Sequence, residues 1–246
     1  MLDPRRANDP RLSHYLDGLP RLRAWLERAI TAECAASPLA SAERPTVATA
    51  SIYLGIKLSE ANRLALAVEK GALLLPRQAN ILREYLLGWA RLSQDVDAFM
   101  FTVYGALDAL AQVLVAVYAV APTEEVKFPA LGRLLADAPA ESGAARVGAA
   151  VAETLDAPWY RDLRRLRNLV NYRAVLPAAP GGALPLQQAS ARWADPPLST
   201  LDRLAALAPF ARRTLADVAG VVEATVALVE ESAVDTERME RGVAGD

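Results

Sequence analysis

Cysteine and histidine are almost absent from this chain of 246 residues, which has one cysteine, Cys34, and one histidine, His14. A single cysteine cannot form an internal disulfide and provides no thiolate cluster for zinc. One histidine leaves little material for a Ser/His/Asp triad, a Cys/His dyad or a multi-histidine metal centre. The cysteine usage indicates a reducing compartment, and we expect neither Cys34 nor His14 to have a chemical role.

A strong charge imbalance is also missing, which limits the classes of partner. The chain carries 27 basic and 29 acidic residues, a formal net charge of -2, and 53% of its residues are hydrophobic. This composition is typical of a folded globular domain and excludes a disordered chain. A protein that coats nucleic acid needs a cationic surface, so a phosphate-binding surface must here be confined to a local segment.

Neither a membrane span nor a targeting segment is predicted. The longest helix-compatible uncharged run, residues 109–123, is shorter than the roughly 20 residues that cross a bilayer. The first residues lack the apolar stretch of a signal peptide. We therefore expect a cytoplasmic protein with no membrane partner.

Carboxylates do not indicate a metal centre. Asp95 and Asp97 are two residues apart and would point to different faces of a helix. A carboxylate site that combines them with Asp108, Glu124 and Glu125 is therefore disfavoured. We expect no metal and no other cofactor.

Apolar residues recur at three- and four-residue spacing through most of the chain, which is typical of amphipathic helices. Ser59 is a suitable N-cap for a helix that Gly71 could end. The pattern from residue 81 to residue 118 predicts one very long helix, or two helices broken near Ser93–Asp97. Segment 47–56 is compatible with a short strand or a helix start. Helices are also predicted at 19–35, 59–70, 128–137, 142–155, 158–176 and 201–237.

About seven helices with little strand signal predict an all-α bundle. We divide the chain into an N-terminal helical region packed on the bundle (1–75), the main bundle (76–235) and a flexible tail (236–246). The connection 177–199 is rich in proline and glycine and includes Trp193, which predicts either an ordered loop or a mobile flap.

The helix predicted from Pro158 carries most of the functional information. Residues 159–173 include five arginines and one aspartate, a local net charge of +4. An apolar stripe is predicted at Leu163, Leu166, Leu169 and Val170, with arginines and asparagines on the other faces. Guanidinium groups suit phosphate oxygens because they bind them in a bidentate fork. The candidate phosphate-binding residues are Arg161, Arg164, Arg165, Asn171 and Arg173.

The run Arg167-Asn168-Leu169-Val170-Asn171-Tyr172 resembles the R-N-x-x-x-H signature of HEPN domains. These helical bundles are best known as metal-independent ribonucleases of bacterial toxin, CRISPR and anti-phage systems. The upstream stretch 101–112 resembles the long aromatic and aliphatic helix that precedes the motif in stand-alone bacterial members. The resemblance covers residues 76–235 and implies an all-α, HEPN-like helical bundle.

The resemblance also implies roles for three candidate catalytic residues, Arg167, Asn168 and Tyr172. The arginine is expected to stabilise phosphoryl charge, and the polar residue beside it to orient the site. The motif histidine would move a proton during attack by a ribose 2'-hydroxyl. Two such motifs usually meet across a dimer, so the resemblance implies a homodimer.

The motif position of the histidine is occupied by Tyr172. An unperturbed tyrosine has a pKa of about 10, so it is a poor general base at pH 7, whereas histidine titrates near neutral pH. Arg167 and Asn168 can still bind an anion. The sequence therefore predicts a protein that binds RNA phosphate or a nucleotide, with a degenerate or weak ribonuclease site.

Two other interpretations remain open. The arginines could be solvated or paired with acidic neighbours, and Tyr172 could be a packed aromatic. The same helix could then bind a partner protein or dimerise without any chemistry. Asp108, a carboxylate in an apolar helix, needs a partner that a motif arginine could supply, and we predict a supporting role for it.

Overall fold

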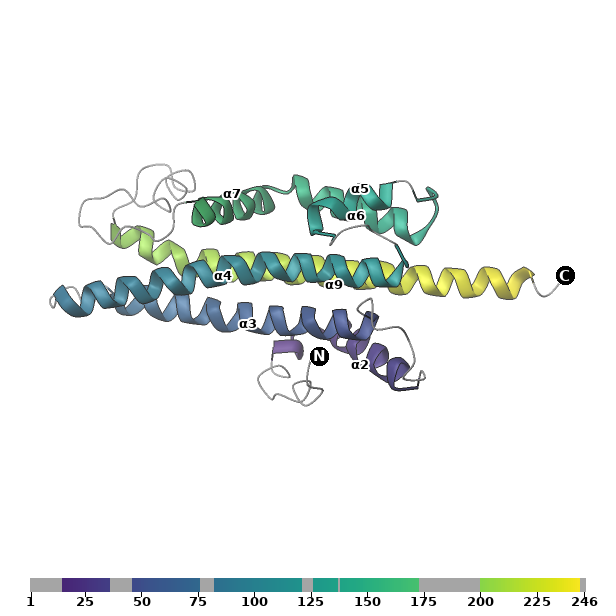
Figure 1. The fold of residues 1–246 in the computed structure, drawn as a ribbon, viewed down its shortest axis with the longest axis horizontal. Helices are drawn as coiled ribbons and strands as arrows, with labels where there is room; N and C mark the ends of the chain where they lie inside the picture. The colour runs from purple at the N-terminus through teal and green to yellow at the C-terminus, as the bar shows by residue number, and fades with distance from the viewer. Residues whose placement is uncertain are drawn as a thin grey trace. The chain divides into compact units, whose positions relative to one another are not determined.

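The computed structural model describes residues 15–35, 46–75, 82–120, 126–136, 138–172 and 200–243. Within these ranges the chain forms seven helices and no strand, which confirms the predicted all-α bundle (Figure 1). His14, Arg173 and the 177–199 connection with Trp193 lie outside the described residues. The helices are α2 (Pro20–Ala35), α3 (Val47–Leu74), α4 (Leu82–Val117), α5 (Phe128–Ala136), α6 (Gly143–Asp156), α7 (Pro158–Tyr172) and α9 (Thr200–Val243).

The chain divides into two compact units. The first unit comprises Met1–Ser59, Gly105–Ala157 and Val218–Asp246. The second unit comprises Glu60–Tyr104 and Pro158–Asp217. The long helices α3, α4 and α9 therefore each contribute residues to both units, whereas α2, α5 and α6 belong to the first and α7 to the second.

α3 begins earlier and ends later than its local signals predict. Segment 47–56 is the start of this helix, and Ser59 and Gly71 lie inside it, so their predicted roles as N-cap and stop are wrong. Buried apolar residues continue at helical spacing past both positions, and tertiary packing of such a stripe outweighs a single cap signal. A side chain at Gly71 would meet the Leu92 side chain on α4 at 3.0 Å, so this glycine allows close helix packing.

α4 is one unbroken helix of 36 residues. Ser93, where a break was possible, is buried inside it, with Leu92 and Val96 buried on either side. The stretch Leu86–Val117 is long and apolar enough to cross a membrane, and 56% of its most apolar part is buried inside the protein. The core helix of a soluble protein meets the same criteria of length and composition.

Polar side chains from distant helices stabilise helix starts in the first unit. The carboxylate of Glu223 on α9 accepts hydrogen bonds from the backbone N–H groups of Arg21, at 3.2 Å, and Leu22, at 2.9 Å, in the first turn of α2. At the start of α6 the signal is local, because the Ser142 hydroxyl accepts from the Ala145 N–H at 3.2 Å. First-turn N–H groups lack partners within their own helix, so both contacts satisfy donors that would otherwise lie unpaired.

α5 and α6 pack closely against each other in the first unit, side by side in Figure 1. Phe128, Leu131, Val147 and Val151 are fully buried between the elements of this unit. A side chain at Gly148 would meet the Leu135 side chain at 3.0 Å, so the close approach of the two helices requires glycine there. In such tight packing, even one added methyl group displaces or strains the neighbouring side chains.

Two glycines of the first unit make a matched test of this packing. A methyl group at Gly143 would overlap the Ser232 side chain, whereas at Gly220 nothing lies within 4 Å. We expect Gly143→Ala to lower the free energy of unfolding by about 1–3 kcal/mol through overpacking. Gly220→Ala should raise it by up to about 1 kcal/mol, because alanine favours a helix interior over glycine. Urea denaturation measures both, and equal effects of the two changes would contradict the close approach at Gly143.

Candidate functional site

The helix with the arginines, α7, begins at a proline in the second unit. Ala157 just before it has extended backbone angles, φ -62° and ψ 137°, and caps α6. A residue that precedes proline is driven out of the helical region by the proline ring, so the sequence Ala157-Pro158 ends one helix and starts the next. Pro158 thus fixes where the 15 residues of α7 begin.

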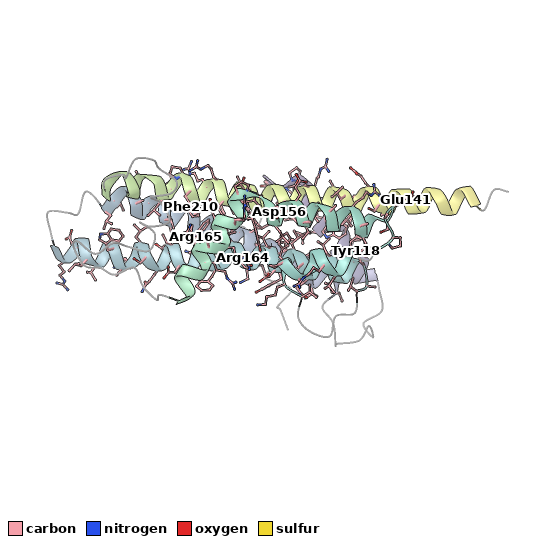
Figure 2. The ribbon with its side chains drawn as sticks, turned by 90° about the horizontal axis from the view of Figure 1, so that it is seen from above. Tyr118, Glu141, Asp156, Arg164, Arg165 and Phe210 are labelled. Atoms are coloured by element: carbon pink, nitrogen blue, oxygen red, sulfur yellow. The ribbon has the colours of Figure 1, made fainter. Side chains whose placement is uncertain are left out.

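One face of α7 is buried and another is exposed, as the sequence predicts. Tyr160, Leu163 and Leu166 are buried and occupy one face of the helix. The side chains of Arg161, Arg164 and Arg165 are exposed. Figure 2 shows Arg164 and Arg165 on this helix. The amphipathic pattern therefore places three of the predicted phosphate-binding guanidinium groups at the surface.

Arg167 is half-buried and lies against an aromatic ring. Its guanidinium carbon is 4.1 Å from the ring centroid of Tyr104 on α4, within the range of a cation–π interaction. Its Nε atom is buried, and no hydrogen-bond acceptor reaches it within the part of the chain that the structure describes. A buried donor without an acceptor costs free energy, so this N–H is suited to an acceptor supplied by a ligand.

The ring beneath Arg167 belongs to a buried aromatic cluster. The hydroxyl oxygens of Tyr104 and Tyr160 are 3.2 Å apart, and their rings stack at 6.2 Å between centroids with an angle of 29°. The Trp159 ring meets Tyr160 edge-on, at 5.9 Å and 89°. Tyr104 and Tyr160 are 5% and 1% exposed, so the hydroxyl pair is closed to water. The cluster gives Arg167 a rigid support.

The exposed arginines of α7 differ from several arginines elsewhere. Arg212 forms a bidentate pair with Glu69, with Nε 3.0 Å from Oε2. Arg23, Arg28 and Arg63 also pair with carboxylates. Among the described residues, Arg161, Arg164 and Arg165 have no carboxylate within ion-pair distance, so nothing there supports the alternative that acidic neighbours neutralise them.

Asp108 lies in the first unit and contacts backbone. Its Oδ1 accepts a hydrogen bond from the N–H of Phe128, the first residue of α5, at 3.0 Å. One turn further along α4, Gln112 Nε2 donates to the carbonyl of Val126 at 2.5 Å. These two polar side chains of an apolar helix anchor the entry into α5, which is the structural role that the geometry assigns to Asp108.

The remaining sequence candidates lie at the end of α7 or beyond it. The backbone of Asn168, Asn171 and Tyr172 is helical, while their side chains are outside the described residues, as is all of Arg173. The sequence analysis missed Tyr104 and Tyr160, the two residues that contact Arg167 or support its contact. The signal for Tyr160 was its seven-residue spacing from Arg167, which places both on one helix face, and no sequence signal linked Tyr104 to Arg167.

Metal ligation finds no support in the described ranges. No group of three or more His, Cys, Asp or Glu side chains there is placed to hold a metal ion. Burial raises the pKa of Asp97, one of the carboxylates considered from the sequence, and a raised pKa disfavours the charged form that a metal would need. The groups that the structure describes at this site are the Arg167 guanidinium and the Tyr104 and Tyr160 hydroxyls.

Comparison of the chain with protein-family models, with curated protein sequences and with solved structures finds no match.

Proposed function

We propose that α7 binds the phosphate groups of RNA or of a nucleotide. The observation that carries the proposal is the buried Nε of Arg167, a donor with no acceptor in the described part of the chain, beside three exposed arginines without ion pairs there. Phosphate oxygens accept charge-assisted hydrogen bonds from guanidinium N–H groups. The half-buried position of Arg167 strengthens such a bond, because water competes less with it.

The motif at the end of α7, residues 167–172, suggests RNA cleavage as the reaction. Arg167 and Asn168 begin the run that resembles the HEPN signature, on a helix of an all-α bundle. We propose a HEPN-like cytoplasmic protein of a bacterial conflict system, a degenerate or weak metal-independent ribonuclease that acts as a homodimer. In this proposal Arg167 binds the phosphate, Asn168 orients the site and Tyr172 occupies the proton-transfer position.

Binding of short single-stranded RNA tests the anion site. We expect weak binding that falls steeply between about 50 mM and 200 mM salt, because each neutralised phosphate releases counterions. Arg167→Ala should weaken binding about tenfold or more at low salt, the cost of a lost hydrogen bond between charged groups. It should also reduce the slope of log K against log salt by about 0.7. Fluorescence anisotropy of a labelled oligonucleotide measures both quantities.

The matched control is Arg133→Ala, which removes an exposed arginine from α5 in the first unit. It changes the net charge by the same amount, so it should leave affinity and slope nearly unchanged. Equal losses in the two variants would mean that only the overall charge matters, and absence of RNA binding at low salt would remove the proposal.

Replacement of Tyr172 tests the reaction. Tyr172→His places a group with a pKa near 6.5 at the motif position, and general acid–base catalysis typically contributes about 100- to 10,000-fold. We expect this variant to cleave RNA faster than the parent without added metal, and Arg167→Ala in the same background to abolish the gain. Gel analysis of end-labelled RNA in the presence of a chelator measures the cleavage rate.

Tyr172→Phe separates the hydroxyl from the ring. If the parent protein cleaves RNA and Tyr172→Phe does not, Tyr172 is itself catalytic and the site is not degenerate. A folded Tyr172→His protein without any gain would contradict a ribonuclease origin of the site and leave binding alone.

A second candidate function is that of a non-enzymatic dimerisation or protein-interaction module. Five leucines of the second unit expose 37–61% of their surface, on α3 and at the start of α4. Exposed apolar side chains bury their surface when a second chain covers them. They are Leu66, Leu73, Leu74, Leu86 and Leu87.

Oligomeric state tests the homodimer, which both candidate functions include, and the leucine variants test whether these leucines form its interface. We expect light scattering to report a homodimer from micromolar to tens of micromolar protein, because burial of the exposed leucines favours association. Leu73→Glu, at the most exposed of the five, should shift the protein towards monomer. Leu134→Glu, an exposed leucine on α5, is the control. A monomeric parent protein over this range would contradict the dimer.

A further inference from the structure

The contact between Arg167 and Tyr104 has a specific geometry. The guanidinium carbon lies 4.1 Å from the centroid of the ring, so the cation is in contact with the aromatic π-system. A cation–π contact attracts the guanidinium charge and provides no oxygen acceptor to its N–H donors. The aromatic contact therefore holds the group and leaves those donors to a phosphate.

Tyr104 is itself held in place. Its hydroxyl pairs with that of Tyr160 at 3.2 Å, and both rings are almost fully buried. Tyr160 precedes Arg167 by seven residues, two helical turns, so both reach Tyr104 from the same face of α7. Three side chains from two helices, all within the second unit, therefore form one connected cluster.

A long arginine side chain normally samples many rotamers, and binding has to restrict them. Contact with a fixed ring restricts these rotamers before the ligand binds, so less side-chain entropy is lost on binding. The same support keeps the Nε atom buried, where no acceptor reaches it among the described residues. The Nε–H is then a donor for which no described residue provides an acceptor, and a phosphate oxygen can provide one.

We infer that Tyr104 is a positioning residue, which fixes the plane of the Arg167 guanidinium so that its buried Nε–H meets one oxygen of a phosphate group. The inference rests on the proposed function for its ligand, and it adds a residue of α4 that lies outside the motif. Tyr160 acts through Tyr104, because its hydroxyl fixes the ring.

Nuclear magnetic resonance of the arginine Nε–H groups tests the positioning without RNA. A proton close to an aromatic face is shielded, so the Arg167 Nε–H signal, assigned by its loss in Arg167→Ala, should be shifted upfield and exchange slowly. Tyr104→Phe and Tyr160→Phe each keep both rings and remove the hydroxyl pair, so each should reduce the shift by a similar small amount. Tyr104→Leu removes the ring and should abolish the shift. An Arg167 signal that is the same in all four proteins would overturn the positioning role.

Inorganic phosphate tests the ligand. Addition of phosphate should move the Arg167 Nε–H signal in the parent and in Tyr104→Phe, and chloride at equal ionic strength separates the effect of an oxyanion from that of salt. A shielded Arg167 signal that phosphate leaves unchanged would overturn the inference, because the arginine would be held but not available. A signal that moves equally with added chloride would overturn it as well.

Short single-stranded RNA links the cluster to the proposed function. Tyr104→Leu should bind it about 3- to 30-fold more weakly, the factor that a partly buried cation–π contact supplies, and Tyr104→Phe should restore the affinity. The double variant Tyr104→Leu/Arg167→Ala should bind no more weakly than Arg167→Ala, since Tyr104 acts through the arginine. Additive losses would contradict this. If the parent binds no RNA while the Nε–H tests succeed, the proposed function fails and the positioning of Arg167 by Tyr104 stands.

Discussion

Burial of one continuous apolar stripe on each long helix is the constraint on which the rest of this structure depends. Phe99, Val103 and Leu107 on α4 are each at most 1% exposed. Once such a stripe is buried, the opposite faces of the helices are free to carry charge, and the same division appears on the short helix α7. The surface position of the arginines is therefore a consequence of how the core is packed.

Polar residues inside the apolar helices connect this core to the ends of the shorter ones. Asp108 and Gln112 lie on α4, and each bonds to a backbone group at the entry into α5. A buried polar group is costly without a partner, and a helix end has unpaired groups to offer. Each hydrogen bond satisfies both a polar side chain of α4 and a backbone group at the entry into α5. The polar residues of the mostly apolar helix α4 therefore help to determine where α5 begins.

The sequence was sufficient for the helices and insufficient for the contacts between them. Periodicity predicts α2, α5, α6 and the exposed arginines of α7, because these features depend on residues close in the chain. It fails at Ser59 and Gly71, where local cap and stop signals are overruled by packing of α3, and Gly71 serves a close approach to Leu92. Tyr104 could not be linked to Arg167 from the sequence, since 63 positions separate them and only the packing of α4 and α7 within the second unit brings them together.

The contact between Glu223 and the first turn of α2 has a consequence for biosynthesis. The acceptor lies 201 residues after Leu22, so a ribosome has made most of the chain before that turn can be capped. Until then its N–H groups can bond only to water or to transient partners, and α2 lacks the non-local contact that fixes its start. α2 thus leaves the ribosome well before Glu223, the residue that completes the hydrogen bonding of its first turn.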